Sequence, residues 1–76
     1  MKDLIATIAK ALVDQPERVS VVEIGGSHNS VLELKVAKSD MGKVIGKQGR
    51  TAQAMRTILI AASGKTRKRY ILEIVE

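Results

Sequence analysis

The sequence predicts an α+β fold in which three helices cover one face of a three-stranded sheet. Helical and alternating apolar patterns follow one another along the chain in the order α-β-β-α-α-β. The 76 residues, of which 45% are apolar and 28% charged, have the composition of a folded domain with one small core. No repeat or linker divides them, so residues 1–76 are expected to form a single domain.

Apolar spacing in the first half predicts one helix and one β-hairpin. A helix is expected over residues 2–14, closed by Pro16, because apolar residues recur there at helical spacing: Leu4, Ile5, Ile8 and Leu12. Residues 18–24 are rich in β-branched side chains, and residues 30–37 alternate between apolar and charged ones. These two strands are expected to pair across a glycine-rich turn that contains His28.

The second half predicts two helices and a last strand. Ser39 is expected to cap a brief helix, with Asp40 near its positive end. Residues 50–62 predict a longer helix that Gly64 ends, and four residues should face the sheet: Met55, Ile58, Leu59 and Ala62. Residues 69–75 predict the third strand, and helices must cover the apolar face of the sheet.

Positive charge gathers in the second half of the chain, whose formal net charge as a whole is +5. Residues 1–40 carry five basic and six acidic side chains, whereas residues 41–76 carry eight basic and two acidic ones. Such asymmetry favours a polyanionic partner, with a solvated basic face as the alternative. Tyr70 is the single aromatic residue, which argues against modules that stack several bases on aromatic side chains.

Composition argues against several other classes of function. Cysteine is absent and His28 is the single histidine, so neither a metal site nor a cofactor is expected. No His–carboxylate or Ser–His arrangement suggests itself, and so short a chain predicts neither catalysis nor a small-molecule substrate. No apolar run approaches the roughly 20 residues of a membrane span, and the absence of cysteine fits a cytoplasmic location.

A short glycine-bounded loop, Gly46-Lys47-Gln48-Gly49, is expected to join the two helices of the second half. Its glycines permit unusual backbone angles and let a ligand approach the main chain closely. The next helix begins with free N–H groups and a positive dipole end, which together favour an anion. Lys43 and Arg50 flank this loop, although a plain helix–helix corner is the alternative interpretation. A P-loop is excluded, because the glycine spacing is one residue short and no Ser or Thr follows the lysine.

The stretch Val44-Ile45-Gly46-Lys47-Gln48-Gly49-Arg50, between a hairpin and a helix, resembles the Ile-Gly-x-x-Gly core of KH domains. The element order is similar to the type II version of that fold. With its length and its GKQGRTAQA segment, the whole chain resembles the KhpA-type single KH-domain RNA-binding proteins of bacteria. Many KH domains carry a large aliphatic residue where this chain has Ala52, a departure that predicts modest base specificity.

The resemblance implies that the loop clamps the backbone of single-stranded RNA, with about four nucleotides in a groove beside it. Ile45 and an exposed edge of the strand at 30–37 are expected to line that groove. The basic run 65–69 would add phosphate contacts, unless it is only a solvated loop. The predicted RNA-binding residues are Lys43, Ile45, Gly46, Lys47, Gln48, Gly49, Arg50, Arg67 and Lys68.

The resemblance further implies a KhpB-type KH-domain partner and a role in post-transcriptional regulation, as an RNA chaperone linked to cell shape. A protein–protein assembly module that binds RNA incidentally remains the alternative function. Ile60 falls on the far side of the longer helix from the expected core face, which suggests a homodimer interface if it is not simply an isolated exposed residue. The residues assigned to that interface are Gln53, Arg56, Thr57, Ile60 and Ala61.

Overall fold

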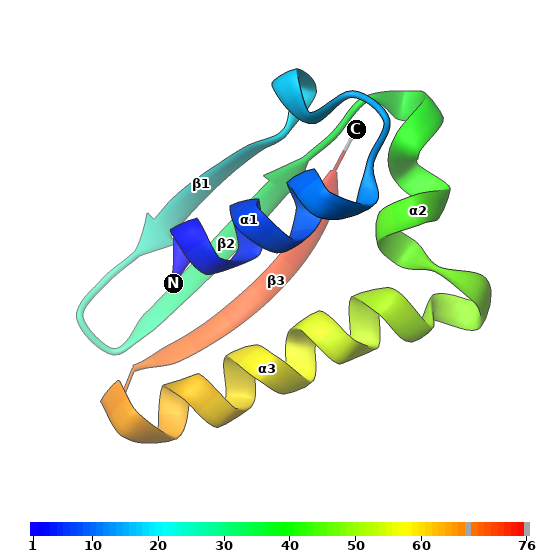
Figure 1. Cartoon of the computed structure of the whole chain (residues 1–76). Helices are drawn as coiled ribbons and strands as arrows, with labels where there is room; N and C mark the ends of the chain where they lie inside the picture. The colour runs from blue at the N-terminus through cyan, green and yellow to red at the C-terminus, as the bar shows by residue number, and fades with distance from the viewer. Residues whose placement is uncertain (67, 76) are drawn as a thin grey trace.

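The computed structural model describes residues 1–66 and 68–75. The elements follow the predicted order: α1 (Lys2–Leu12), β1 (Ser20–Gly25), β2 (Asn29–Lys35), α2 (Met41–Ile45), α3 (Arg50–Thr66) and β3 (Arg69–Val75). Short 3-10 turns occupy Pro16–Arg18, Lys38–Asp40 and Lys47–Gly49. Figure 1 shows α1 and α3 lying over one face of the sheet, with α2 at the end of that helical layer. The predicted α+β fold is confirmed.

The sheet has the strand order β1-β2-β3, so that β2 is its central strand. β1 and β2 form the predicted antiparallel hairpin, whereas β3 runs parallel to β2. The alternation predicted from the sequence is also confirmed, because Leu32 and Leu34 of β2 are buried against the helices. The core between sheet and helices comprises Ile5, Ala9, Leu32, Leu34, Val36, Val44, Met55, Leu59 and Leu72.

Helix α1 is shorter than predicted and buries a narrower stripe. Ile5 and Ala9 are fully buried, while Leu4 and Leu12, which were expected to face the core, are exposed. The helix ends at Leu12 because the next residue, Val13, takes an extended conformation with φ −97° and ψ 161°. Helical spacing predicted one buried face formed by Leu4, Ile5, Ile8 and Leu12. The small Ala9, together with Ile5, forms the buried part of that helix instead.

The carboxylate of Asp40 fastens the chain after α1 to the start of α2. It is 1% exposed and accepts hydrogen bonds from the backbone N–H groups of Asp14 at 3.2 Å and Gln15 at 3.1 Å. The prediction that Ser39 caps the helix is wrong: Asp40 is the N-cap residue, and no side chain bonds the helix N-terminus. Ser39 instead accepts a hydrogen bond from the side-chain amide of Gln15 at 3.1 Å.

Substitution of Asp40 by alanine should destabilise the domain by about 2 kcal/mol, because two amide donors lose a charged, buried acceptor. For a domain of this size, that loss lowers the Tm by roughly 8–16 °C. Asp14→Ala is the matched control, because the Asp14 side chain is 76% exposed and solvent screens its ion pair with Lys43, so its removal should cost little stability. Thermal unfolding of both variants by circular dichroism measures the difference. Equal losses of stability would show that the buried carboxylate is not the fastening group.

Helix α3 continues past Gly64 to Thr66, so the predicted end at Gly64 is wrong. Gly64 keeps helical geometry instead of the left-handed conformation of a terminating glycine. Met55 and Leu59 are buried as predicted, whereas Ile58 is exposed. Ile58 is exposed because the buried stripe is centred on Met55 and Leu59 and includes Ala52, leaving Ile58 at its border.

Candidate nucleic-acid interface

Gly46 closes α2 in a conformation that a larger residue would strain. Its φ of 78° lies in the left-handed region, and its N–H donates to the Gly42 carbonyl at 2.9 Å. A Cβ atom at this position would lie 2.2 Å from the Thr51 side-chain oxygen and 2.8 Å from the Thr51 backbone nitrogen. Glycine at 46 is therefore required both by its backbone angles and by the first turn of α3 packed against it.

The loop itself is a single 3-10 turn over Lys47–Gly49. Within it, Gln48 takes a left-handed conformation with φ 57°, and Gly49 has φ 74°. The Gly49 N–H donates to the Gly46 carbonyl at 3.1 Å, and the Arg50 N–H donates to the carbonyl of Lys47. The N–H groups of Lys47 and Gln48 come first in the turn, where no partner within the turn is available. The loop thus presents backbone donors at the positive end of α3.

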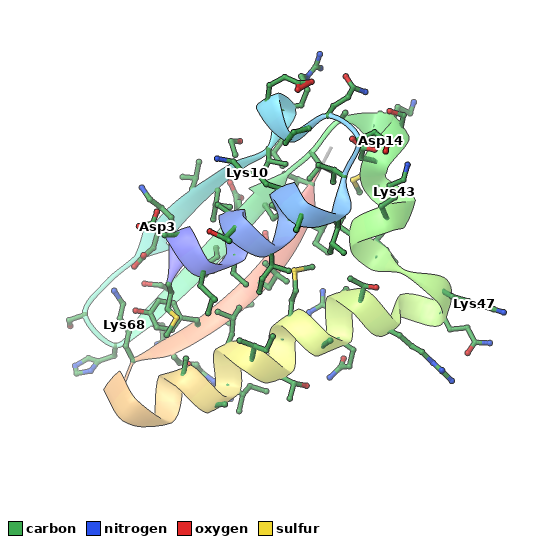
Figure 2. The ribbon with its side chains drawn as sticks, in the orientation of Figure 1. Asp3, Lys10, Asp14, Lys43, Lys47 and Lys68 are labelled. Atoms are coloured by element: carbon green, nitrogen blue, oxygen red, sulfur yellow. The ribbon has the colours of Figure 1, made fainter. Side chains whose placement is uncertain are left out.

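Two cationic side chains accompany these donors. Lys47 and Arg50 are both exposed, and neither forms an ion pair with any residue that the structure describes. Figure 2 shows Lys47 extending from the loop away from the body of the molecule. An anion at the loop could therefore contact main-chain donors and both cations without displacing an internal partner.

Lys43, although predicted to act with the loop, is engaged elsewhere. Its ammonium group pairs with Asp14 at 2.5 Å and lies 3.7 Å from the buried carboxylate of Asp40. The hydrogen bond to Asp14 raises the pKa of Lys43 above its usual range. In Figure 2 Lys43 points toward Asp14, away from Lys47. The structure thus separates Lys43 from the cations of the loop.

Lys68 lies at the opposite end of the molecule from Lys47 (Figure 2). Its ammonium group pairs with Glu23 at 2.9 Å and lies 5.6 Å from the centre of the Tyr70 ring. This hydrogen bond raises the pKa of Lys68 and, together with one from the Ser30 hydroxyl, lowers that of Glu23. Arg67, also predicted to bind RNA, lies outside the described residues. Lys68 is therefore not part of the loop's cationic cluster.

The strand order contradicts one predicted wall of the RNA-binding groove, the free edge of the strand at 30–37. β2 was expected to offer a free edge beside the loop, but β1 and β3 occupy both of its edges. Ile45 does remain at the surface, 38% exposed, directly before Gly46. Ala52 is buried in the core, so its small size does not deepen an open groove.

The predicted dimer residues share the exposed face of α3. Gln53, Arg56, Thr57, Ile60 and Ala61 are all exposed, and Ile60 is the most exposed large apolar residue described, at 68%. Beside Ile60, a groove of about 220 Å³ runs between α3 and β3. Arg69 and Tyr70 line it from β3, a contribution that the helical wheel could not reveal, because it depends on tertiary packing.

Two helices joined by a Gly-x-x-Gly loop, packed on a three-stranded sheet with a parallel β2–β3 pair, define a KH domain. A sequence model described as KhpA/KhpB, KH domain, matches residues 2–74. The chain belongs to this family of KH-domain proteins, as the sequence resemblance indicated.

Similar proteins are found in several bacteria. A protein of Caldanaerobacter subterraneus subsp. tengcongensis is 60% identical over 75 residues, covering 99% of this chain and 100% of the relative. One from Clostridium acetobutylicum is 57% identical with the same coverage, and one from Aquifex aeolicus is 51% identical, covering 100% of this chain and 96% of the relative. All three are named RNA-binding protein KhpA. No solved structure matches the chain.

Proposed function

We propose that this chain binds single-stranded RNA through the Gly46-Lys47-Gln48-Gly49 loop, as a regulator in the cytoplasm rather than as an enzyme. The loop geometry carries the proposal: two N–H donors and two uncommitted cations meet at the start of α3. The names of the relatives support RNA as the ligand, and they describe binding proteins, not enzymes. Among the described residues, no helix is long and apolar enough to cross a membrane.

The arrangement favours the sugar–phosphate backbone over the bases as the ligand of the loop. A phosphate would accept hydrogen bonds from the N–H groups of Lys47 and Gln48, while the side chains of Lys47 and Arg50 neutralise its charge. Space beside Gly49 is open, since a Cβ there would meet no atom within 4 Å. Ile45 offers an apolar surface to an adjacent base. Because phosphate contacts carry no sequence information, we expect weak sequence preference from the loop alone.

The dependence of affinity on salt tests which cations contact RNA. Each phosphate neutralised on a single strand contributes about −0.7 to the slope of log K against log salt, so Lys47 and Arg50 together predict about −1.4. Lys47→Ala should reduce the slope to about −0.7, whereas Lys43→Ala should leave it unchanged. Fluorescence anisotropy with a labelled short RNA at several salt concentrations measures these slopes. If Lys43→Ala reduced the slope and Lys47→Ala left it unchanged, Lys43 and not Lys47 would be the lysine that contacts phosphate.

A homodimer through the exposed face of α3 would place two such loops on one particle. Two weak sites on one RNA raise the effective concentration at the second site without any new contact. The exposed Ile60 beside the groove between α3 and β3 supports this proposal. A KhpB-type protein using the same face is the alternative partner, and it would make the chain chiefly an assembly module.

Ile60→Lys should convert the dimer into a folded monomer. Its affinity for long RNA should fall at least about tenfold, while affinity for a four-nucleotide fragment stays the same. Ile58→Lys is the matched control, because Ile58 is also exposed but lies on a different side of α3. Light scattering at tens of micromolar protein reports the oligomeric state. A monomeric wild type would refute the homodimer and favour the assembly with a different protein.

A further inference from the structure

Strand β1 lies at one margin of the sheet, and its outer edge has no partner among the described residues (Figure 1). Proteins commonly block such edges with proline, lysine, a bulge or a charge. β1 contains no proline or lysine, and its register with β2 runs without a bulge along Ser20–Gly25. Its one charged residue, Glu23, accepts hydrogen bonds from the Ser30 hydroxyl at 3.0 Å and the Lys68 ammonium at 2.9 Å. These bonds draw the carboxylate toward β2, so the free edge is left unprotected.

The hydrogen-bond pattern of the hairpin determines which backbone groups lie on the free edge. The Gly26 N–H donates to the Asn29 carbonyl at 2.9 Å, so these two residues form a hydrogen-bonded pair. Such pairs alternate along antiparallel strands, and the backbone groups of Val22 and Ile24 are therefore directed to β2. The residues of β1 whose backbone groups point to the free edge are the alternate ones, among them Val21 and Glu23. Each presents one N–H donor and one C=O acceptor to the outside.

A cavity of about 350 Å³ opens at the same edge, between the first residues of α1 and the middle of β1. Residues of both elements line it: Met1, Lys2, Asp3, Val21, Val22 and Glu23. Side chains alternate between the two faces of a strand, so a strand added along β1 would direct every second side chain toward this cavity. Because three of the six lining residues are charged, the cavity favours polar side chains.

We propose that an extended segment of another protein binds along β1 as a fourth strand of the sheet. Its main chain bonds to the outward N–H and C=O groups of Val21 and Glu23. Its polar side chains enter the cavity, and its apolar ones pack beside Val22 and Ile24, each of which is 51% exposed. β1 and β3 are opposite margins of the sheet, and α3 packs against β3. The loop at residues 46–49 therefore stays accessible when β1 is occupied.

The cavity favours this occupant over a second copy of the chain, which would offer its own β1. In an antiparallel two-fold pair, the side chains brought to the cavity include Val21 and Glu23 of the second copy. Val21 packs against the core of its own copy, and Glu23 is held by Ser30 and Lys68, so neither can fill the cavity. A register centred on Glu23 would also place two carboxylates opposite each other. A segment with uncommitted side chains satisfies both the edge and the cavity.

Peptides that differ only in their main-chain donors test the proposal on the full chain. The probe is a peptide of alternating valine and serine with blocked ends and a lysine at each terminus. Two further versions carry N-methyl groups, one on every valine and the other on every serine. An added strand turns only one of these sets of N–H groups toward β1. One version should therefore bind like the unmodified peptide and the other at least about tenfold more weakly, as measured by fluorescence anisotropy.

Hydrogen exchange locates the peptide on the protein. The unmodified peptide should slow exchange of the Val21 and Glu23 amides at least about tenfold, because both amides gain an acceptor. The amides of Val22 and Ile24 already bond β2 and should change little. Slowed exchange confined to other parts of the chain, equal affinity for the two N-methylated versions, or no binding of the unmodified peptide would overturn the proposal.

Two variants of one residue separate the edge from the side chain. Glu23→Pro and Glu23→Ala both remove the carboxylate, but only proline lacks the outward N–H, and an edge strand tolerates proline where that N–H faces solvent. Glu23→Ala should bind the peptide like the wild type, and Glu23→Pro, shown to be folded by circular dichroism, at least about tenfold more weakly. Equal affinities of the two variants would contradict pairing at this edge. Self-association that Glu23→Pro abolishes and Glu23→Ala retains would overturn the proposal in favour of a second copy.

Discussion

Replacement of Lys47 and Gln48 by aspartate should weaken binding to short single-stranded RNA by about 30- to 150-fold. One charge-assisted contact is lost and two carboxylates enter a phosphate site, which together cost about 2–3 kcal/mol. The fold should be unaffected, because both side chains are exposed and aspartate tolerates the left-handed conformation of residue 48. Anisotropy titrations and thermal melts of the double variant give the two quantities, and the Tm should change by no more than about 2 °C.

A matched variant separates this local effect from the change in net charge. Lys2→Asp/Thr7→Asp alters the charge by the same amount at exposed positions of α1, and residue 2 lies in the first turn, where an acidic side chain is tolerated. Its affinity for the same RNA should fall by less than about threefold at physiological salt, because α1 begins far from the loop and exposed charges are screened. Equal losses in both variants would mean that only the overall positive charge attracts RNA.

Gly46→Ala should cost about 2–3 kcal/mol of stability and remove RNA binding. A left-handed conformation costs a residue with a Cβ atom about 1–2 kcal/mol, and this Cβ atom also collides with Thr51. The collision involves the Thr51 backbone nitrogen, so rotation of one side chain cannot relieve it. Either the loop or the first turn of α3 must move, and both form the phosphate site. We expect a Tm lower by roughly 10–20 °C.

Gly49→Ala provides the comparison within the same loop. Its φ of 74° is also unfavourable for alanine, but no atom beyond the adjacent residues lies within 4 Å of the new Cβ. The loss should therefore be limited to about 1–2 kcal/mol of backbone strain. Chemical denaturation of the two variants side by side measures the difference. If both alanines cost the same, contact with Thr51 does not determine the loop conformation.

The fold could be predicted because its signals are local in the sequence. Alternation along residues 30–37 predicted the strand that forms β2, and Ile60 stood apart from the apolar stripe of its helix; both assignments agree with the observed burial. Element ends were less predictable. Ser39 had the usual identity of a helix cap, yet the neighbouring Asp40 uses its carboxylate to bind amides 25 and 26 residues away. No local pattern encodes such a contact.

The candidate site was predictable only where the backbone defines it. Two glycines three residues apart correctly indicated a tight loop directly before a helix. The availability of each cation was not predictable, because it depends on distant partners. Asp14 pairs with Lys43 from 29 residues away, and Glu23 pairs with Lys68 from 45 residues away. The prediction that the strand at 30–37 has a free edge in the groove was wrong for a similar reason. The strand order follows from the parallel crossover through α2 and α3, which places β3 beside β2.

Titration of the isotope-labelled protein with a four-nucleotide single-stranded RNA tests the central claim most directly. Backbone amide signals report the position of the ligand without any substitution. We predict that the largest shifts fall on the amides of Lys47, Gln48, Gly49 and Arg50, with a smaller shift at Ile45. Shifts concentrated on Lys68–Tyr70 or on the face of the sheet away from the helices, with the four loop amides unchanged, would contradict the assignment of RNA binding to this loop.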